Sequence, residues 1–250
     1  MWRRRRTLAA GAAAQHPESA DPTEHVIDVR DVGVTADGHR VLNAVSVTLR
    51  APTTAVIGAN GSGKSTFARL LNGLVLPTTG NVVVHGDDTQ HARERVRSHV
   101  GFIFANPEAQ ILMPTAREDI ALSLRSHGVA KNLIDEQTQR VLENFRLHEH
   151  ADQPAYSLSG GQKQLLALAA VLSTSPTVLV ADEPTTLLDL AHSTMMSDLL
   201  IDSVTAQRII VTHDLELAAR CDEAILFDGG TVTAHGEVGD VIGQYRRSYA

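Results

Sequence analysis

A glycine-rich segment, Gly58–Ser65, constrains the fold of this chain more than any other part of its 250 residues. It reads Gly-Ala-Asn-Gly-Ser-Gly-Lys-Ser and matches the pattern G-x-x-x-x-G-K-[ST]. The β-branched run Thr54–Ile57 precedes it, and Ser65–Leu74 follows it with apolar residues at helical spacing. The order strand, glycine loop and helix predicts an α/β fold with this loop at the end of a buried strand.

The same loop predicts a phosphate-binding site. Glycines let the backbone turn so that several N–H groups point at one phosphate, and the following helix adds its positive N-terminal end. Lys64 is expected to reach the β- and γ-phosphates of a nucleotide, and the Ser65 hydroxyl to bind Mg²⁺. A purely structural glycine turn is the alternative, which the flanking strand and helix disfavour.

Two carboxylates, Asp182 and Glu183, directly follow a second apolar run, Val178–Ala181. Such a run is typical of a buried parallel strand, and α/β sheets bind ligands beyond the carboxyl ends of these strands. Asp182 is expected to hold Mg²⁺ through water, and Glu183 to orient or deprotonate the water that attacks the γ-phosphate. An ordinary acidic loop is the alternative, which a phosphate loop beside it disfavours.

A Ser-Gly-Gly sequence stands immediately before the apolar helix predicted over Leu165–Leu172. The exposed N–H groups of a helix N-terminus form an anion site, so Ser159, Gly160 and Gly161 provide a second surface that could grip a nucleotide. A plain helix cap is common at such a sequence and is the alternative interpretation.

Elsewhere the sequence alternates predicted strands and helices. Val26–Val34 and Val41–Leu49 flank a turn signal and predict an antiparallel pair. A helical insert is expected at about 105–164, and Leu187–Ile201 is expected to be helical. These patterns predict a parallel sheet covered by helices on both faces, with an antiparallel β subdomain and an inserted α-helical subdomain.

Charge and hydropathy exclude two classes of protein. The net charge of −7 and the pI near 5.9 count against a general nucleic-acid binder, which would carry a basic surface. The longest apolar run is Leu165–Leu172, whereas a membrane-spanning helix needs about 20 residues, so no span is expected. A single cysteine, Cys221, allows no internal disulfide and fits a reducing cytoplasm.

Residues 1–24 are expected to be a disordered, Ala-rich tail, which leaves 25–250 as the folded domain. Arg3–Arg6 followed by Leu8–Ala14 has the outline of an export signal, but its apolar part is weak and broken by glycine. A disordered extension, or a start codon placed too early, is the favoured interpretation.

Taken together, these motifs resemble the ATP-binding-cassette (ABC) ATPases, in the family's order over residues 26–250. The matching positions are Gly58, Ala59, Asn60, Gly61, Ser62, Gly63, Lys64, Ser65, Thr66, Leu158, Ser159, Gly160, Gly161, Gln162, Asp182, Glu183, Asp189 and His213. The resemblance implies a P-loop NTPase core, with ATP and Mg²⁺ as cofactors.

The same resemblance implies two active sites per dimer. The Ser159–Gly161 turn of one subunit would close on the γ-phosphate held by the other subunit's loop. His213 would contact the γ-phosphate and support the water positioned by Glu183. Asp189 would lie at the dimer contact.

A closer resemblance is to the ATPase subunits of energy-coupling-factor uptake systems for vitamins and metals. The segment Phe104–Thr115 is similar to that group's F-Q-N-P-x-x-Q segment, and Thr185–Asp189 is similar to the biotin-uptake ATPase subunit. The resemblance implies a homo- or heterodimer at the cytoplasmic face of the membrane, with transmembrane energy-coupling and substrate-binding partners.

Two positions depart from the family pattern. Ala105 stands where a glutamine contacts Mg²⁺ and the attacking water, and Ala36 stands where an aromatic ring stacks on adenine. Gln110, five residues after Ala105, is not expected to substitute. A nucleotide-binding subunit with little hydrolysis therefore remains an alternative, as does a soluble single-cassette ATPase such as an iron–sulfur cluster assembly subunit.

The histidines outside these motifs suggest no further site. His148-Glu149-His150 could indicate a metal site, but residues two apart point to different sides of a helix, so a solvated face is expected. The other histidines form no visible constellation.

Overall fold

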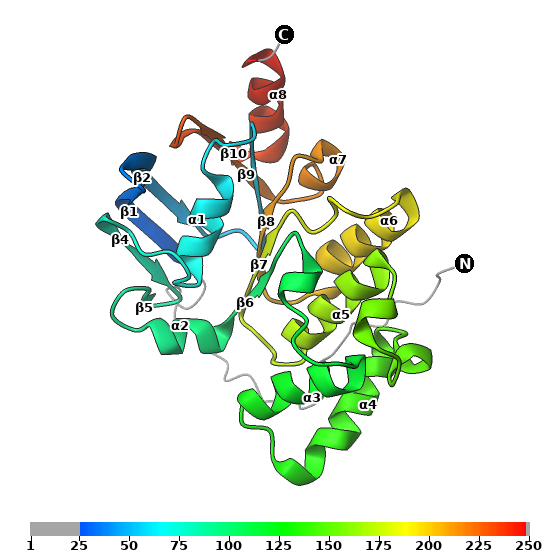
Figure 1. Cartoon of the computed structure of the whole chain (residues 1–250). Helices are drawn as coiled ribbons and strands as arrows, with labels where there is room; N and C mark the ends of the chain where they lie inside the picture. Colours follow the sequence, from blue (N-terminus) through cyan, green and yellow to red (C-terminus); the bar gives the residue numbers. More distant parts are fainter. Residues whose placement is uncertain (1–25, 249–250) are drawn as a thin grey trace, which may run out of the picture. The chain divides into compact units, whose positions relative to one another are not determined.

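The computed structural model describes residues 26–248, which form two compact units (Figure 1). The helical unit comprises Ile103–Pro176 and Pro184–Thr205. The sheet unit comprises the described residues up to Phe102, together with Thr177–Glu183 and the residues from Ala206 onward. The predicted tail and its arginine run lie outside the described residues. Within 26–248, no helix has both the length and the apolar character needed to cross a membrane.

A six-stranded sheet in the order β10-β9-β3-β8-β7-β6 carries the core of the sheet unit. Its strands are β3 (Thr53–Gly58), β6 (Val100–Ile103), β7 (Val178–Asp182), β8 (Gln207–Val211), β9 (Glu223–Asp228) and β10 (Thr231–Glu237). β3 pairs in parallel with both β8 and β9, β7 pairs in parallel with β8, and β10 is antiparallel to β9. Every residue of β3, β7 and β8 is buried, which explains their largely apolar sequences.

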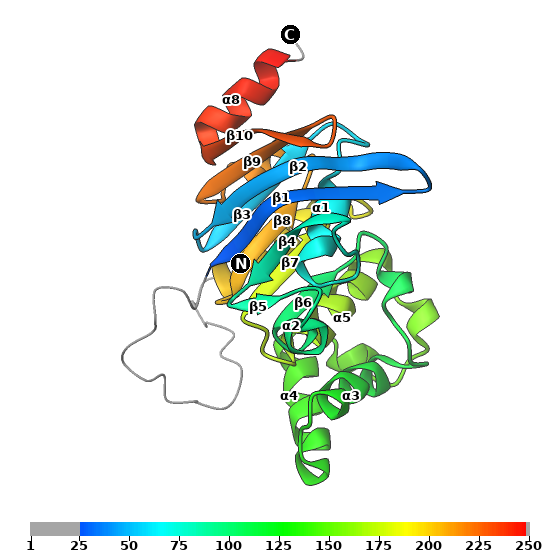
Figure 2. The same ribbon diagram turned by 90° about the vertical axis from the view of Figure 1, so that its left-hand side faces the viewer.

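The second sheet has four strands in the order β2-β1-β4-β5, and Figure 2 shows β1 and β2 side by side. The strands are β1 (Ile27–Ala36), β2 (His39–Leu49), β4 (Thr79–Val84) and β5 (Asp87–Asp88). The predicted antiparallel pair is confirmed, because β1 pairs with β2 from Ile27 opposite Leu49 to Ala36 opposite His39. The alternation of buried residues in β1 shifts at a bulge that contains Asp31, whose φ is 48°.

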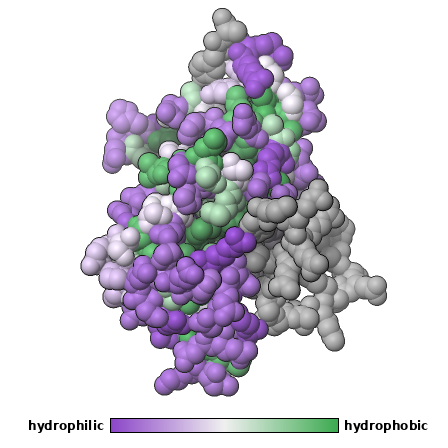
Figure 3. Space-filling view, turned by 90° about the vertical axis from the view of Figure 1, so that its right-hand side faces the viewer, coloured by the Kyte–Doolittle hydropathy of each residue, from purple (hydrophilic) through white to green (hydrophobic). Residues whose placement is uncertain are grey.

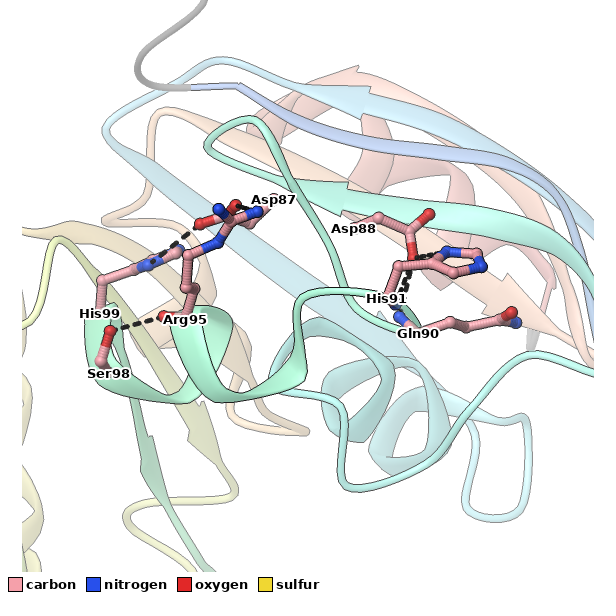
Figure 4. A network of polar contacts seen from close by, with 7 residues as sticks. All are labelled: Asp87, Asp88, Gln90, His91, Arg95, Ser98 and His99. Carbon is pink, nitrogen blue, oxygen red and sulfur yellow. Dashed lines mark hydrogen bonds and ion pairs between the residues drawn. The ribbon is translucent and has the colours of Figure 1, made fainter.

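Polar contacts join β5 to the helix that follows it (Figure 4). The Asp87 carboxylate forms an ion pair with the Arg95 guanidinium, at a distance of 2.8 Å between nitrogen and oxygen. His99 Nδ1 lies 3.9 Å from the other oxygen of the same carboxylate. The next carboxylate, Asp88, accepts from the backbone N–H of His91 at 3.0 Å. These contacts link β5 to the turn and the helix that connect the two sheets.

The helices of the sheet unit are α1 (Lys64–Leu71), α2 (Arg93–His99), α7 (Leu215–Ala218) and α8 (Val238–Ser248). α1 follows β3 and the glycine loop, so the predicted order strand, loop and helix is confirmed. Its buried face includes Phe67, whose ring centroid lies 5.1 Å from that of Phe227 on β9. This aromatic pair fixes α1 against the strand next to β3.

The helical unit contains α3 (Ala116–Ser126), α4 (Ile134–Asn144), α5 (Gly160–Leu172) and α6 (Leu190–Asp198), which continues as a π-helix over Leu199–Ser203. α3 and α4 pack together and carry mostly hydrophilic side chains on the face drawn in Figure 3. Buried Asp119 of α3 accepts the backbone N–H groups of Leu112 and Met113 at 2.8 and 3.0 Å. The carboxylate therefore holds the preceding loop onto the helix.

Two helix starts differ from the prediction. α5 begins at Gly160 rather than after the glycines, because Ser159 and Gln162 form a capping box at its first turn. α6 begins at Leu190 rather than Leu187, because the Asp189 side chain accepts the His192 N–H at 2.9 Å and caps the helix there.

The expected mixed α/β fold class, with an antiparallel sheet and helices, is confirmed. The sequence patterns predict no helix or strand beyond His213, where the structure has α7, β9, β10 and α8. The apolar run Ala224–Phe227 is a signal that could have identified β9.

We expect Phe67→Ala to lower the free energy of unfolding by about 3–5 kcal/mol, because it removes a fully buried ring and leaves a cavity beside Phe227. Leu74→Ala, at a residue 44% exposed, is the matched control and should cost less than about 1 kcal/mol. Urea unfolding of the full chain measures both values. Equal losses for the two variants would contradict the assigned core.

Candidate functional site

The glycine loop between β3 and α1 allows no side chain at two of its glycines. Gly58 and Gly63 have φ values of 142° and 104°, which other residues rarely adopt. A Cβ at Gly58 would overlap the carbonyl oxygen of Phe227, and one at Gly63 would lie 2.6 Å from the Leu42 side chain. The positive φ values explain both glycines, and at Gly58 the close approach of the Phe227 carbonyl adds a second reason.

Lys64, the first residue of α1, folds back over this loop. Its Nζ donates to the carbonyl oxygens of Gly58 and Ala59, each at 2.8 Å. Burial lowers the pKa of Lys64 from its ordinary value, although the nearby carboxylates of Glu183 and Asp182 act in the opposite direction. The loop thus presents a cation that is largely removed from water.

The loop fits a phosphate group in two further respects. The hydroxyl of Ser62 is buried without a hydrogen-bond partner, which is costly unless a ligand or water supplies one. Gly61, with φ 79°, has open space where a Cβ would stand. Asn60 is exposed at the tip of the loop, and Thr66 lies in the first turn of α1.

The first carboxylate of the acid pair faces the start of α1. Ser65 Oγ donates to Asp182 Oδ1 at 2.9 Å, and Arg69 lies 4.0 Å from Oδ2. Burial raises the pKa of Asp182 above its ordinary value, against the opposing effect of the Ser65 hydrogen bond. A buried carboxylate beside a hydroxyl could hold Mg²⁺, whose positive charge would offset this cost of burial.

The second carboxylate pairs with the predicted histidine. His213 Nδ1 lies 2.7 Å from Glu183 Oε2, and because a carboxylate oxygen accepts hydrogen bonds, Nδ1 is the donor. Glu183 has φ 54°, an unfavourable conformation for a residue with a side chain, and its N–H donates to the Val211 carbonyl at 2.9 Å. The strands β7 and β8 therefore set the direction of the Glu183 side chain.

These groups form one cluster within the sheet unit. The glycine loop, Lys64 and Ser65 come from the β3–α1 connection, Asp182 from the end of β7, and His213 from the residues after β8. A nucleotide triphosphate there would meet a cation, backbone N–H groups, a metal-ligating pair and a carboxylate that can orient water. The arrangement suits phosphoryl transfer to water.

The Ser-Gly-Gly motif lies in the helical unit. Ser159 Oγ accepts the Gln162 N–H at 3.2 Å, and Gln162 Oε1 accepts the Ser159 N–H at 2.8 Å. Gly160 is exposed and Gly161 is buried. The first turn of α5 is therefore a rigid helix N-terminus of the kind that binds anions.

Asp189 lies in the same unit, where it caps α6. Its carboxylate also contacts His192 Nδ1, at 2.8 Å from Oδ1 and 2.9 Å from Oδ2. Sequence reasoning missed His192, since its contacts depend on how α6 lies beside α5.

Two further contacts with α5 were also missed. Lys163 pairs with Glu108 of the Phe104–Thr115 segment at 2.5 Å. The predicted solvated face at His148-Glu149-His150 is wrong in part, because the His150 ring contacts Gln162 at 2.8 Å. These three residues also form a 3₁₀ turn rather than part of an α-helix.

Two residues bear on the departures from the family pattern. They are Ala36 itself and Gln110, the glutamine that follows Ala105 in the sequence. Ala36 is exposed at the end of β1, opposite His39. Gln110 Oε1 accepts the Phe104 N–H at 3.3 Å, so its side chain turns back toward the residue before Ala105.

Comparison with known proteins supports the family assignment. Residues 42–186 match the model of the family described as ABC transporter. The biotin transport ATP-binding protein BioM of Rhizobium etli is 39% identical over 220 residues, covering 88% of this chain and 97% of that protein. The energy-coupling factor transporter ATP-binding protein EcfA1 of Bacillus subtilis is 37% identical over 186 residues, covering 73% of this chain and 66% of that protein.

A solved structure agrees with these matches. CbiO1 of Clostridium perfringens, described as part of an ABC transporter complex, aligns with a TM-score of 0.78 and 25% identity, covering 90% of this chain and 94% of that chain. The family model matches more than half of the chain, and both relatives exceed 30% identity. The chain therefore belongs to the ABC transporter family and is one of its ATPases.

Proposed function

We propose that this chain hydrolyses ATP as a subunit of an energy-coupling-factor type importer that takes up a vitamin or a metal ion. The observation that carries the catalytic part is the pair formed by Glu183 and His213 in the same cluster as buried Lys64. The importer type is supported by the relatives named for biotin and energy-coupling factor transport, and by the Phe104–Thr115 segment. Among the cargoes, biotin is our first candidate because of the BioM relative.

Each group in the cluster has a proposed role. Lys64 and the loop N–H groups neutralise the charge of the β- and γ-phosphates. Ser65, directly, and Asp182, through water, would hold Mg²⁺, which when bound adds a positive charge to the phosphates. Glu183 orients the attacking water and accepts its proton, while His213 holds the Glu183 carboxylate and contacts the γ-phosphate.

The second half of each site is proposed to come from another copy or a related subunit. The Ser159–Gly161 turn, capped through Gln162, presents helix N–H groups to the γ-phosphate held by the partner. Asp189 lies at the dimer contact. Closure of this dimer on ATP excludes water from the phosphates and supplies the mechanical step.

The proposed location is the cytoplasmic face of the cell membrane, with transmembrane energy-coupling and substrate-binding subunits as partners. Affinity purification from detergent-solubilised membranes tests this: integral membrane proteins and a bound solute should co-purify. Recovery with soluble scaffold proteins alone would instead support a cluster-assembly ATPase, which the transport names of the relatives do not favour.

One observation favours a variant of this function. Ala105 supplies no side chain to contact Mg²⁺ or the attacking water, so turnover slower than in typical members is the second candidate. A large rise in steady-state hydrolysis in Ala105→Gln would support it, whereas equal rates in the two proteins would count against it.

We expect Glu183→Gln to reduce ATP turnover by about 10²–10⁴-fold while ATP binding and ATP-dependent dimerisation persist, because the amide cannot accept the proton. Steady-state phosphate release and equilibrium nucleotide binding measure the two effects. Glu223→Gln is the matched control, because Glu223 also pairs with a histidine, His235, at 3.2 Å, but outside the cluster. Undiminished turnover in Glu183→Gln would remove Glu183 from this role.

We expect Ala36→Tyr to strengthen ATP binding several-fold, because stacking on a base contributes about 1–3 kcal/mol. Ala36→Leu separates ring stacking from added apolar surface and should change the affinity less. Fluorescent-nucleotide titration gives the dissociation constants. Identical affinities for the wild type and Ala36→Tyr would show that adenine does not lie beside the end of β1.

A further inference from the structure

The imidazole ring of His192 lies between two groups of the helical unit that both belong to the proposed dimer contact. On one side, Nδ1 lies 2.8 and 2.9 Å from the two carboxylate oxygens of Asp189. On the other side, the ring packs against Gly161, where an added Cβ would lie 2.5 Å from Cγ and 2.8 Å from Nε2. A single side chain therefore separates the Asp189 carboxylate from the first turn of α5.

The Asp189 contact fixes the orientation of this ring. The His192 backbone N–H also donates to Asp189 Oδ1, at 2.9 Å. Both the backbone and the ring of His192 therefore donate to the Asp189 carboxylate. Because that carboxylate accepts hydrogen bonds, Nδ1 is the donor and the ring cannot turn over without losing the bond. Of the ring atoms, Cγ, Cδ2 and Nε2 are those nearest to Gly161.

The two neighbouring glycines of the motif differ in their surroundings. A Cβ at Gly160 would meet only the carbonyl oxygen of Leu187, at an ordinary distance of 3.7 Å. At Gly161 the His192 ring already occupies the space. A side chain at residue 161 would therefore displace the His192 ring from its place beside Asp189, within one protomer and before any ligand or partner is considered.

We infer that His192 is a positioning residue, which holds Asp189 at the start of α6 and the Ser159–Gly161 turn in one fixed relation so that both meet the partner protomer together. Displacing the ring would allow either element to move without the other. The inference rests on the proposed function, in which these two elements contact the partner protomer and its nucleotide. His192 itself is assigned no contact with ATP.

Thermal unfolding of the full chain without nucleotide tests the contact by itself. Gly161→Ala should lower Tm by about 3–10 °C, because the added Cβ overlaps the His192 ring and either the ring or α5 must move. Adding His192→Ala should restore Tm, because the ring is gone and alanine favours a helix over glycine. Gly160→Ala is the control and should not lower Tm. Failure of the double variant to recover would overturn the contact.

ATP-dependent dimerisation, measured by sedimentation in a Glu183→Gln background, tests the positioning role. His192→Asn can keep a hydrogen bond to Asp189 but removes the ring, and His192→Phe keeps a ring but removes the bond. His192→Phe should weaken the dimer about fivefold, the factor expected for one lost hydrogen bond, and His192→Asn should weaken it similarly through loss of the ring contact with Gly161. In each variant Tm should fall by no more than about 4 °C. His127→Asn, at an exposed histidine of α3's C-terminal cap, should have no effect.

The outcomes separate the two hypotheses. Wild-type dimerisation in either His192 variant would overturn the positioning role, even if the Tm series confirms the contact. Absence of an ATP-dependent dimer in the Glu183→Gln background alone, with its His192 intact, would overturn the proposed function instead, whatever the Tm series shows. About fivefold weaker dimerisation in both His192 variants, with stable folding and wild-type dimerisation in His127→Asn, would support the inference.

Discussion

The site in the sheet unit depends on close backbone approach in the glycine loop. Gly58 stands where its Cβ would overlap the carbonyl of Phe227, and the Phe227 ring packs on Phe67 of α1. The loop is thus held between β9 and the helix it precedes. Lys64 can then bring its ammonium group over the loop carbonyls at 2.8 Å, in a position where burial lowers its pKa. A looser loop would leave this cation in water, where its effect on a phosphate would be small.

The parallel strands bring the remaining chemistry to this loop. β3, β8 and β7 are hydrogen-bonded neighbours, so the residues at their carboxyl ends lie close together although they are far apart in the sequence. Asp182 reaches Ser65, and Glu183 reaches His213. The unfavourable φ of Glu183 directs its side chain, and such backbone conformations are common at functional sites.

Sequence reasoning predicted this cluster well because its parts are local. A glycine loop before a helix, and acids after an apolar strand, each place functional atoms within a few residues of a recognisable element. The helix boundaries at Gly160 and Leu190 were less accurate, because a cap is set by side-chain geometry that periodicity does not describe. His192 was missed for a stronger reason, since its second contact, with Gly161, is made by another helix.

The sequence alone determined the fold class, the glycine loop between a strand and a helix, and the place of the acid pair after a buried strand, because hydrophobic periodicity and motif spacing are properties of short segments. Only the tertiary structure decided which nitrogen of His213 faces Glu183, which side chain lies against Gly161, and which histidine contacts the Asp189 carboxylate. The contacts of His213 with Glu183 and of His192 with Gly161 join segments that are far apart in the sequence and share no local pattern. The packing of helices and strands on folding brings these segments together.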